Sequence, residues 1–222
     1  MTTFLLLRHA HSTANNAGVL AGRINGVKLS TIGKKQARDL GKALNDLKID
    51  RIISSPLTRC TETIEATARH RRKRVLIDER FTEMDYGSWN GRKLKDLAQE
   101  KSWKKIQSKP SSFTFPKGES FAEAATRIER GLKSLMRKYP QETVLIVTHG
   151  DIIKMALQLS HGGSLDSFQR FVVDTCSLSE IHWTAQSRTV VRSNSRLVKA
   201  RVVQMAKNKM KQRKILGGGA GV

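Results

Sequence analysis

The sequence predicts an α/β protein with a largely parallel sheet, and two observations carry that prediction. Short apolar runs rich in Val, Ile and Leu alternate along the chain with longer segments whose apolar residues recur at helical spacing. The chain has 222 residues, 38% of them apolar, which is enough to bury a core in one domain without disulfides or metal. This alternation is typical of strands joined by crossover helices.

Four apolar runs bounded by polar or turn residues predict the strands of the sheet, at residues 4–7, 51–53, 75–77 and 143–147. Two segments between these runs place their apolar residues on one helical face, and we expect helices there, at 32–47 and 121–135. Segments 172–183 and 189–203 predict one or two later strands, the second at an edge of the sheet.

Capping residues predict where two further helices begin. Ser55 and Pro56 supply an N-cap and a first-turn proline for a helix that runs to about Ala68. Asp151 can cap a helix over residues 152–159, which a Gly-Gly pair then ends. We find no internal repeat, so we expect one domain over residues 1–203, followed by a tail over residues 204–222.

The chain carries a strong excess of positive charge. It has 41 Lys and Arg against 19 Asp and Glu, a formal net charge of +22. The excess is densest between Arg188 and Lys214, where no acid occurs, and a glycine-rich end follows. Such a field attracts anions from small phosphates to nucleic acid. A nucleic acid or other polyanion is a conceivable partner of this basic tail, but no aromatic interleaving or recognised motif favours it.

The two cysteines indicate a reducing compartment. Cys60 and Cys176 stand far apart and outside any Cys-x-x-Cys or Cys/His spacing, which argues against a disulfide framework and a structural zinc site. The N-terminus has no basic region and too short an apolar run for a signal peptide, and no later run approaches membrane-spanning length. We therefore expect a cytoplasmic protein without a membrane span.

Polar residues suited to phosphate follow three of the four predicted strands. Arg8 and His9 follow the first strand, Arg59 lies shortly after the second, and His149 and Gly150 follow the fourth. Ligands of open α/β sheets bind where strands end at their carboxyl side. Arginines and histidines that converge there would repel one another unless an anion lay among them, and guanidinium groups match phosphoryl oxygens in pairs. The sequence therefore predicts a site for a small phosphorylated substrate.

The chemistry at this site is expected to need no metal and no cofactor. The sequence has neither a Walker loop nor an acidic cluster of the kind that binds magnesium for phosphoryl transfer. A histidine with one unprotonated ring nitrogen can instead act as the nucleophile and form a covalent intermediate. Glu83, six residues beyond the third predicted strand, can protonate the leaving oxygen and later accept a proton from water.

Blocks of motif residues occur along most of the chain, and in their order they resemble one known family. The blocks are Arg8-His9, Ser54-Ser55-Pro56-Leu57 with Arg59, Glu83 with Tyr86-Gly87, Gly118-Glu119-Ser120, and His149-Gly150. They resemble the histidine phosphatase superfamily, also called the phosphoglycerate mutase-like family. The resemblance implies a three-layer α/β/α sandwich with a mostly parallel central sheet.

The resemblance also implies a role for each site residue. His9 would be the residue phosphorylated, Arg8, Arg59 and His149 would hold the phosphoryl oxygens, and Glu83 would donate the proton. Further phosphate or substrate contacts are expected at a second set of residues: Asn15, Gly22, Gly150 and His11.

Three departures from the family pattern bear on function. Ala10 replaces the glycine that usually follows the nucleophilic histidine, a change that the backbone tolerates if φ is negative. Ala21 lacks the hydroxyl that mutases often have before Gly22. The chain between Glu83 and His149 is shorter than in typical phosphoglycerate mutases, whose insert helps to hold a second anionic group.

The missing hydroxyl and the shorter chain favour a phosphatase over a mutase. The expected function is therefore a metal-independent phosphatase that hydrolyses small phosphate monoesters. Two alternatives stay open. One is a cofactor-dependent phosphomutase, which would use the same phosphohistidine but return the group to a substrate hydroxyl and not to water. Within the family, the turn at residues 20–23 and the glycine-rich C-terminus resemble an actinobacterial branch that is often labelled as phosphomutases. The other is a weakly catalytic, polyanion-binding protein on the same fold.

Overall fold

A computed structural model describes residues 1–196. Residues 197–222 lie outside the described part of the chain. The predicted domain end at residue 203, the tail over 204–222 and a polyanion partner for that tail therefore stay predictions. No helix within residues 1–196 combines the length and the apolar character needed to cross a membrane.

A single six-stranded sheet forms the middle layer, in the order β3-β2-β4-β1-β5-β6. The first four strands are parallel to one another, whereas β5 runs antiparallel to β1, and β6 antiparallel to β5. The strands are β1 (Thr2–Arg8), β2 (Arg51–Ser54), β3 (Val75–Ile77), β4 (Thr143–Thr148), β5 (Ser177–Trp183) and β6 (Arg188–Arg196). All four predicted strands are confirmed.

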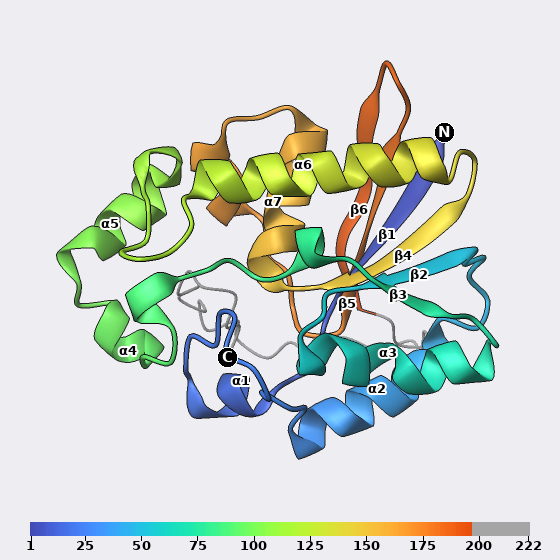
Figure 1. Cartoon of the computed structure of the whole chain (residues 1–222), viewed down its shortest axis with the longest axis horizontal. Helices are drawn as coiled ribbons and strands as arrows, with labels where there is room; N and C mark the ends of the chain where they lie inside the picture. Colours follow the sequence, from blue (N-terminus) through green and yellow to red (C-terminus); the bar gives the residue numbers. More distant parts are fainter. Residues whose placement is uncertain (197–222) are drawn as a thin grey trace, which may run out of the picture.

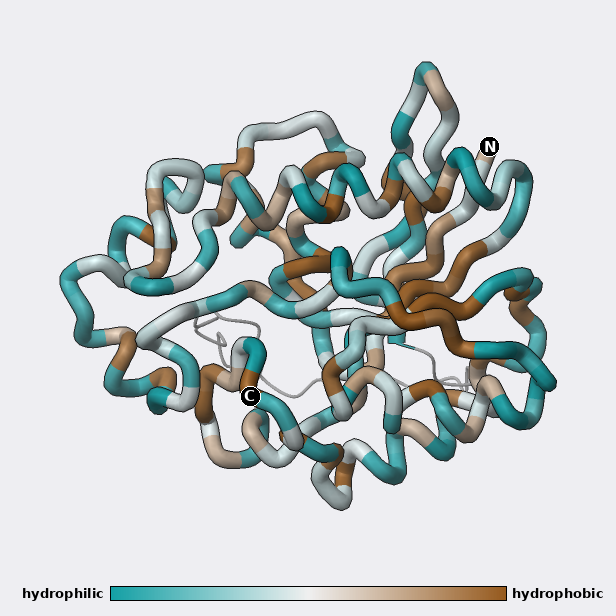
Figure 2. The backbone as a smooth tube through the Cα atoms, in the orientation of Figure 1, coloured by the Kyte–Doolittle hydropathy of each residue, from teal (hydrophilic) through white to brown (hydrophobic). Residues whose placement is uncertain are grey.

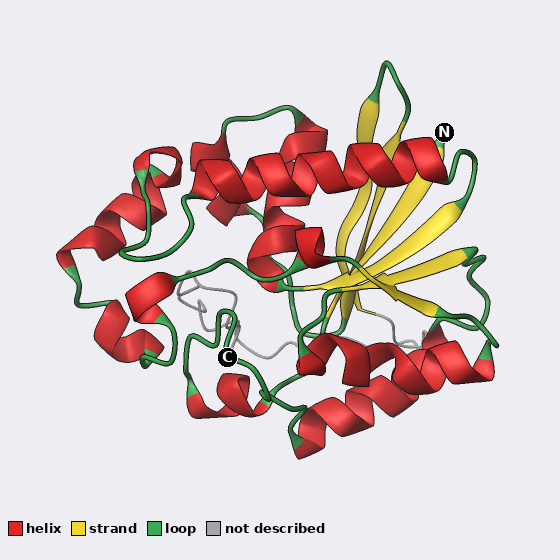
Figure 3. Ribbon diagram, viewed as in Figure 1, coloured by secondary structure: helices red, strands yellow, loops and turns green. Residues whose placement is uncertain are grey.

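Helices cover both faces of the sheet, which confirms the three-layer sandwich (Figures 1 and 3). The helices α2 (Thr31–Ala43) and α3 (Thr58–His70) lie on one face. The other face carries α6 (Phe121–Lys138) and α7 (Gly150–His161). The long helix predicted over 121–135 is confirmed, and Ser120 begins it with a capping box.

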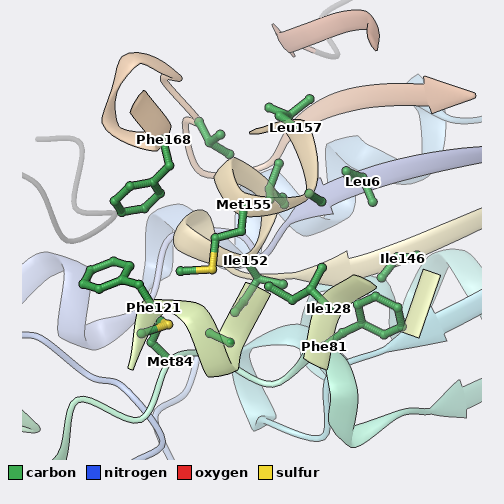
Figure 4. Packing of buried hydrophobic residues seen from close by; sticks show 14 of the residues in the cluster. Leu6, Phe81, Met84, Phe121, Ile128, Ile146, Ile152, Met155, Leu157 and Phe168 are labelled. Atoms are coloured by element: carbon green, nitrogen blue, oxygen red, sulfur yellow. The ribbon is translucent and has the colours of Figure 1, made fainter. Parts of the chain in front are cut away.

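Alternate residues of each central strand point to opposite faces of the sheet, so the core has one part on each face. Along β1, Phe4 and Leu6 belong to the apolar cluster on the α6–α7 side, whereas Leu5 and Leu7 belong to the cluster on the α2–α3 side. Both faces are buried, so the central strands are apolar along their length, as Figure 2 shows. On the α6–α7 side, Leu6 packs in the same cluster as the residues labelled in Figure 4.

A smaller layer of short helices and loops extends from the sandwich beyond the start of α6 (Figure 1). It contains α4 (Leu94–Leu97) and α5 (Lys101–Ser108), and α1 (Thr13–Ala17) lies below it in the view of Figure 1. Aromatic side chains hold this layer together: Trp89 stacks on Trp103 with ring centroids 6.2 Å apart.

Three expected starts of elements were wrong, and the helix predicted over residues 32–47 ends earlier, at Ala43. The helix α3 begins at Thr58 without a side-chain cap, because the Ser55 hydroxyl is bonded to His149 instead. The helix α7 begins at Gly150, so Asp151 lies inside its first turn and not at the cap.

The third error concerns the start of the first late strand, which was expected at residue 172. The strand β5 begins only at Ser177, because Cys176 adopts a left-handed φ of 60° that ends the preceding loop. That loop holds the Arg8 side chain, since the Val173 carbonyl accepts a hydrogen bond from Arg8 Nη1.

Candidate active site

A pocket opens where the parallel strands end at their carboxyl side. Arg8 is the last residue of β1, Arg59 lies in the first turn of α3, and Glu83 lies in the loop after β3. These three line the pocket together with His9. The fold thus brings the predicted nucleophile, both arginines and the predicted acid to one place.

His9 is held as a neutral imidazole with a defined tautomer. Its Nδ1 lies 2.8 Å from the backbone carbonyl oxygen of Ala10, which can only accept, so Nδ1 carries the proton and Nε2 keeps its lone pair. Burial, together with the charges of Arg59 and Arg8, holds the pKa of His9 well below its usual 6.5. At neutral pH the ring is therefore a ready nucleophile.

Ala10 fits where the family usually has glycine. Its backbone N–H donates to Thr63 Oγ1 at 2.9 Å, and its methyl group is fully buried. Ala10 is not among the described residues with a positive φ, so the methyl group costs no backbone strain.

The two arginines are each tied by one nitrogen and leave another without a partner. Arg8 donates Nη1 to the Val173 carbonyl at 2.7 Å, and its buried Nε has no partner within residues 1–196. Arg59 donates Nη2 to the Gly22 carbonyl at 2.7 Å, and its buried Nη1 is likewise unpaired in the described part. Burial lowers the pKa of Arg8, but a guanidinium stays charged at neutral pH. These orphaned donors suit the oxygens of a phosphoryl group.

His149 stands behind His9, with ring centroids 5.3 Å apart. Its Nε2 lies 2.8 Å from Ser55 Oγ, and it is fully buried but not among the residues that line the pocket. Burial first, and then the charge of Arg59, holds the pKa of His149 well below 6.5. Cys60 Sγ lies 3.5 Å from the same Nε2, and burial raises the pKa of that thiol to about 12, so it stays protonated.

Glu83 has the properties of a general acid. Burial, and then the neighbouring charge of Asp151, raises the pKa of the Glu83 carboxyl from 4.5 to about 7. Its Oε1 accepts the Met84 N–H at 3.0 Å, and its Oε2 lies 3.9 Å from His149 Nδ1. A carboxyl group with this pKa can give up and take back a proton near neutral pH.

The remaining predicted contacts divide into two pairs. Asn15 and Gly22 line the pocket. Asn15 Oδ1 accepts from the Ser12 N–H and hydroxyl at 3.0 and 2.9 Å, and the Asn15 backbone N–H donates to the Ser12 hydroxyl at 3.2 Å. His11 and Gly150 are not among the lining residues: His11 Nδ1 lies 2.8 Å from Ser30 Oγ, and Gly150 is the buried first residue of α7.

The sequence did not predict the contacts that two residues beside the site, Ser55 and Tyr86, make. Ser55 was expected to cap a helix, although it bonds to His149, and Tyr86 was noted only as part of a motif. Tyr86 lines the pocket and donates its hydroxyl to Asp151 Oδ2 at 2.8 Å. No local pattern signals such long-range bonds.

Among residues 1–196, no group of three or more His, Cys, Asp and Glu is arranged to hold a metal ion.

The sheet, the pocket and its charges define a class of protein that binds and transfers phosphoryl groups. Residues 4–196 match the model of the histidine phosphatase superfamily, branch 1, and the chain belongs to this superfamily. The resemblance seen in the sequence is thereby confirmed.

Phosphoserine phosphatase 1 of Hydrogenobacter thermophilus is a relative of the chain with 29% identity over 196 residues, which cover 87% of this chain and 92% of the relative. A "Probable phosphoglycerate mutase" of Erwinia tasmaniensis is 30% identical over 183 residues, 82% of this chain and 85% of the relative. The α-ribazole phosphatase of Shigella flexneri superposes with a TM-score of 0.77 at 27% identity, covering 89% of this chain and 98% of that one.

Proposed function

We propose that this protein is a phosphatase that hydrolyses small phosphate monoesters through a phosphohistidine on His9, without a metal ion. One observation carries the proposal: a neutral, buried His9 shares a pocket with two arginines and with a carboxyl group whose pKa is raised to about 7. This combination supplies a nucleophile, charge for the phosphoryl oxygens and an acid for the leaving group.

In the first transfer, the His9 Nε2 lone pair attacks phosphorus and an N–P bond forms. The ester P–O bond breaks opposite to it, and the leaving oxygen takes the proton of the Glu83 carboxyl. Arg8 and Arg59 offset the charge that spreads over the equatorial oxygens. His149 lies beside His9, held by Ser55, and does not line the pocket, so no contact with these oxygens is assigned to it.

In the second transfer, water attacks phosphorus from the side that the leaving group vacated. Glu83, now a carboxylate, accepts a proton from that water as the O–P bond forms. The N–P bond breaks, and its electron pair returns to His9 Nε2, which restores the neutral ring. Phosphate leaves, and the enzyme is ready for the next turnover.

Metal independence rests on the charge that the side chains themselves supply. The two guanidinium groups carry the positive charge that a metal ion provides in other phosphoryl-transfer sites. The named substrates of the relatives, phosphoserine and α-ribazole phosphate, are both small monoesters.

A cytoplasmic location is part of this proposal and is supported by two free cysteines.

The test is phosphate release from a panel of phosphate monoesters in the presence of a chelator, with wild type and His9→Ala side by side. We expect chelator-resistant turnover that the variant loses. Turnover that needs added metal, or that survives in His9→Ala, would contradict the proposal.

A phosphomutase is the second candidate, because one relative is named as a mutase. A mutase would return the phosphoryl group to a substrate hydroxyl and not to water. Isomerised product on addition of a bisphosphorylated cofactor, at a rate above hydrolysis, would favour this candidate.

A further inference from the structure

Three charged side chains that the mechanism does not use meet next to the Glu83 loop. The Glu119 carboxylate accepts a two-pronged contact from Arg127, with Nε to Oε1 at 2.8 Å and Nη2 to Oε2 at 2.9 Å. Arg23 donates Nη2 to the same Oε2 at 3.1 Å. Only 12% of the Glu119 side chain is exposed, so these contacts are shielded from solvent.

The two arginines use their other nitrogens on the backbone around Glu83. Arg127 Nη1 donates to the carbonyl oxygens of Arg80 and Thr82 at 2.7 and 2.9 Å. Arg23 Nε donates to the carbonyl oxygen of Glu83 itself at 2.9 Å. One carboxylate therefore anchors two guanidinium groups, which in turn hold three backbone carbonyls at and before Glu83.

Glu119 is also bonded directly to the chain that follows Glu83. Its backbone N–H donates to the Asp85 carbonyl at 2.8 Å, and its Oε2 accepts the Asp85 N–H at 3.4 Å. The neighbouring Gly118 makes this approach possible, because a Cβ there would lie 2.4 Å from the Asp85 carbonyl oxygen and 2.6 Å from the Gly87 nitrogen.

We propose that Glu119 is the positioning residue for the proton donor Glu83. The inference rests on the proposed function. Residues 82–86 belong to no helix or strand, so the path of the backbone that carries the Glu83 carboxyl depends on contacts from outside this segment. Without the Glu119 charge, Arg23 and Arg127 would lose their common anchor, and a small displacement of a catalytic group is costly in rate.

The test compares Glu119→Gln with wild type on two kinds of substrate. The leaving oxygen of an alkyl phosphate needs a proton, whereas the 4-nitrophenolate of 4-nitrophenyl phosphate leaves readily without one. We expect kcat/KM for the alkyl phosphate to fall by roughly ten- to a hundredfold, and kcat/KM for the aryl phosphate to fall by less than about threefold. Inhibition by inorganic phosphate should stay unchanged, because Arg8 and Arg59 are untouched.

Glu129→Gln is the matched control. Glu129 lies within α6, close to Arg127 in sequence, and like Glu119 it pairs with two cations, Lys133 and Arg188. Within residues 1–196, no hydrogen bond or ion pair joins the Glu129 side chain to residues 79–86. The Glu129→Gln variant removes the same charge as Glu119→Gln, and we expect it to keep its activity on both substrates.

Equal losses of Glu119→Gln on both substrates, or no loss on either, would overturn the inference while leaving the proposed function in place. A wild-type enzyme without turnover would instead overturn the proposed function, and the inference with it. If Glu119→Gln does not fold, Arg23→Gln decides the matter by the same comparison, because the Arg23 side chain is 36% exposed and its loss opens no core cavity.

Discussion

Ser55 Oγ lies 2.8 Å from His149 Nε2, so the residue after β2 holds a histidine that follows β4. The two strands are neighbours, with Ser54 paired to Val147, and the sheet register therefore brings the serine and the histidine together. Both residues are fully buried. The hydroxyl thereby fixes the orientation of a ring that stands beside the nucleophile.

Replacing Ser55 by alanine should leave the His149 ring free to turn. We expect kcat/KM to fall by about tenfold on alkyl and aryl substrates alike, the cost of losing one buried hydrogen bond at the site. Steady-state kinetics measures this. Ser160→Ala is the control, since Ser160 is a buried serine bonded to Trp183 away from the pocket, and it should lower stability without lowering activity.

His9→Ala should abolish both turnover and covalent labelling by a ³²P-labelled monoester, because among the described residues His9 is the only histidine that lines the pocket. Acid-labile, alkali-stable label on wild type and none on the variant is the expected result. His70→Ala replaces an exposed histidine and should label normally. Label that persists in His9→Ala would place the nucleophile elsewhere.

The pH dependence of the first transfer should follow Glu83. The acid is active when protonated, and the pKa of the carboxyl is about 7, whereas the pKa of His9 lies well below 6.5. We therefore expect kcat/KM for an alkyl phosphate to fall as pH rises through about 7. Glu83→Gln should lower this rate and remove the pH limb, with a smaller loss on 4-nitrophenyl phosphate. A limb that persists in the variant would assign the titration to another group.

Glu83 should also lower the stability of the fold above neutral pH. Its pKa is raised in the folded state, so the folded protein binds the proton more tightly than the unfolded chain does. The stability cost is absent below pH 4.5, grows as pH rises to about 7 and is constant above it. Glu83→Gln should gain in free energy of unfolding over wild type across this window, as urea unfolding at pH 5 and pH 8 would show. A gain that is the same at both pH values would contradict this origin.

Gly22→Ala should damage the phosphate site through its backbone. Gly22 has a φ of +48°, a Cβ there would lie 1.8 Å from Asn90 Oδ1, and its carbonyl anchors Arg59. We expect at least about a tenfold loss of kcat/KM on every substrate, because a displaced Arg59 weakens phosphate binding in general. Gly26→Ala is the matched control: Gly26 also has a positive φ, of +74°, but its Cβ would meet nothing within 4 Å.

The order of elements and most of the site were predictable from local patterns. The apolar run at residues 143–147 and the apolar helical face from Phe121 to Leu135 both result from burial in the core. Burial repeats the apolar residues at the period of the strand or helix, so the local sequence shows it. His9, Arg59 and Glu83 were predictable because each lies close after a strand, and parallel strands end at one edge of the sheet.

The sequence by itself thus determined the fold class, the family and six residues that line the pocket: Arg8, His9, Asn15, Gly22, Arg59 and Glu83. Only the tertiary structure decided what Ser55, Asp151 and Glu119 do. A hydroxyl or carboxylate can bond to its own backbone or to a distant partner, and both choices leave the same local pattern. The partner of Ser55 is 94 residues away, so the sheet register made the choice, not the residues beside it.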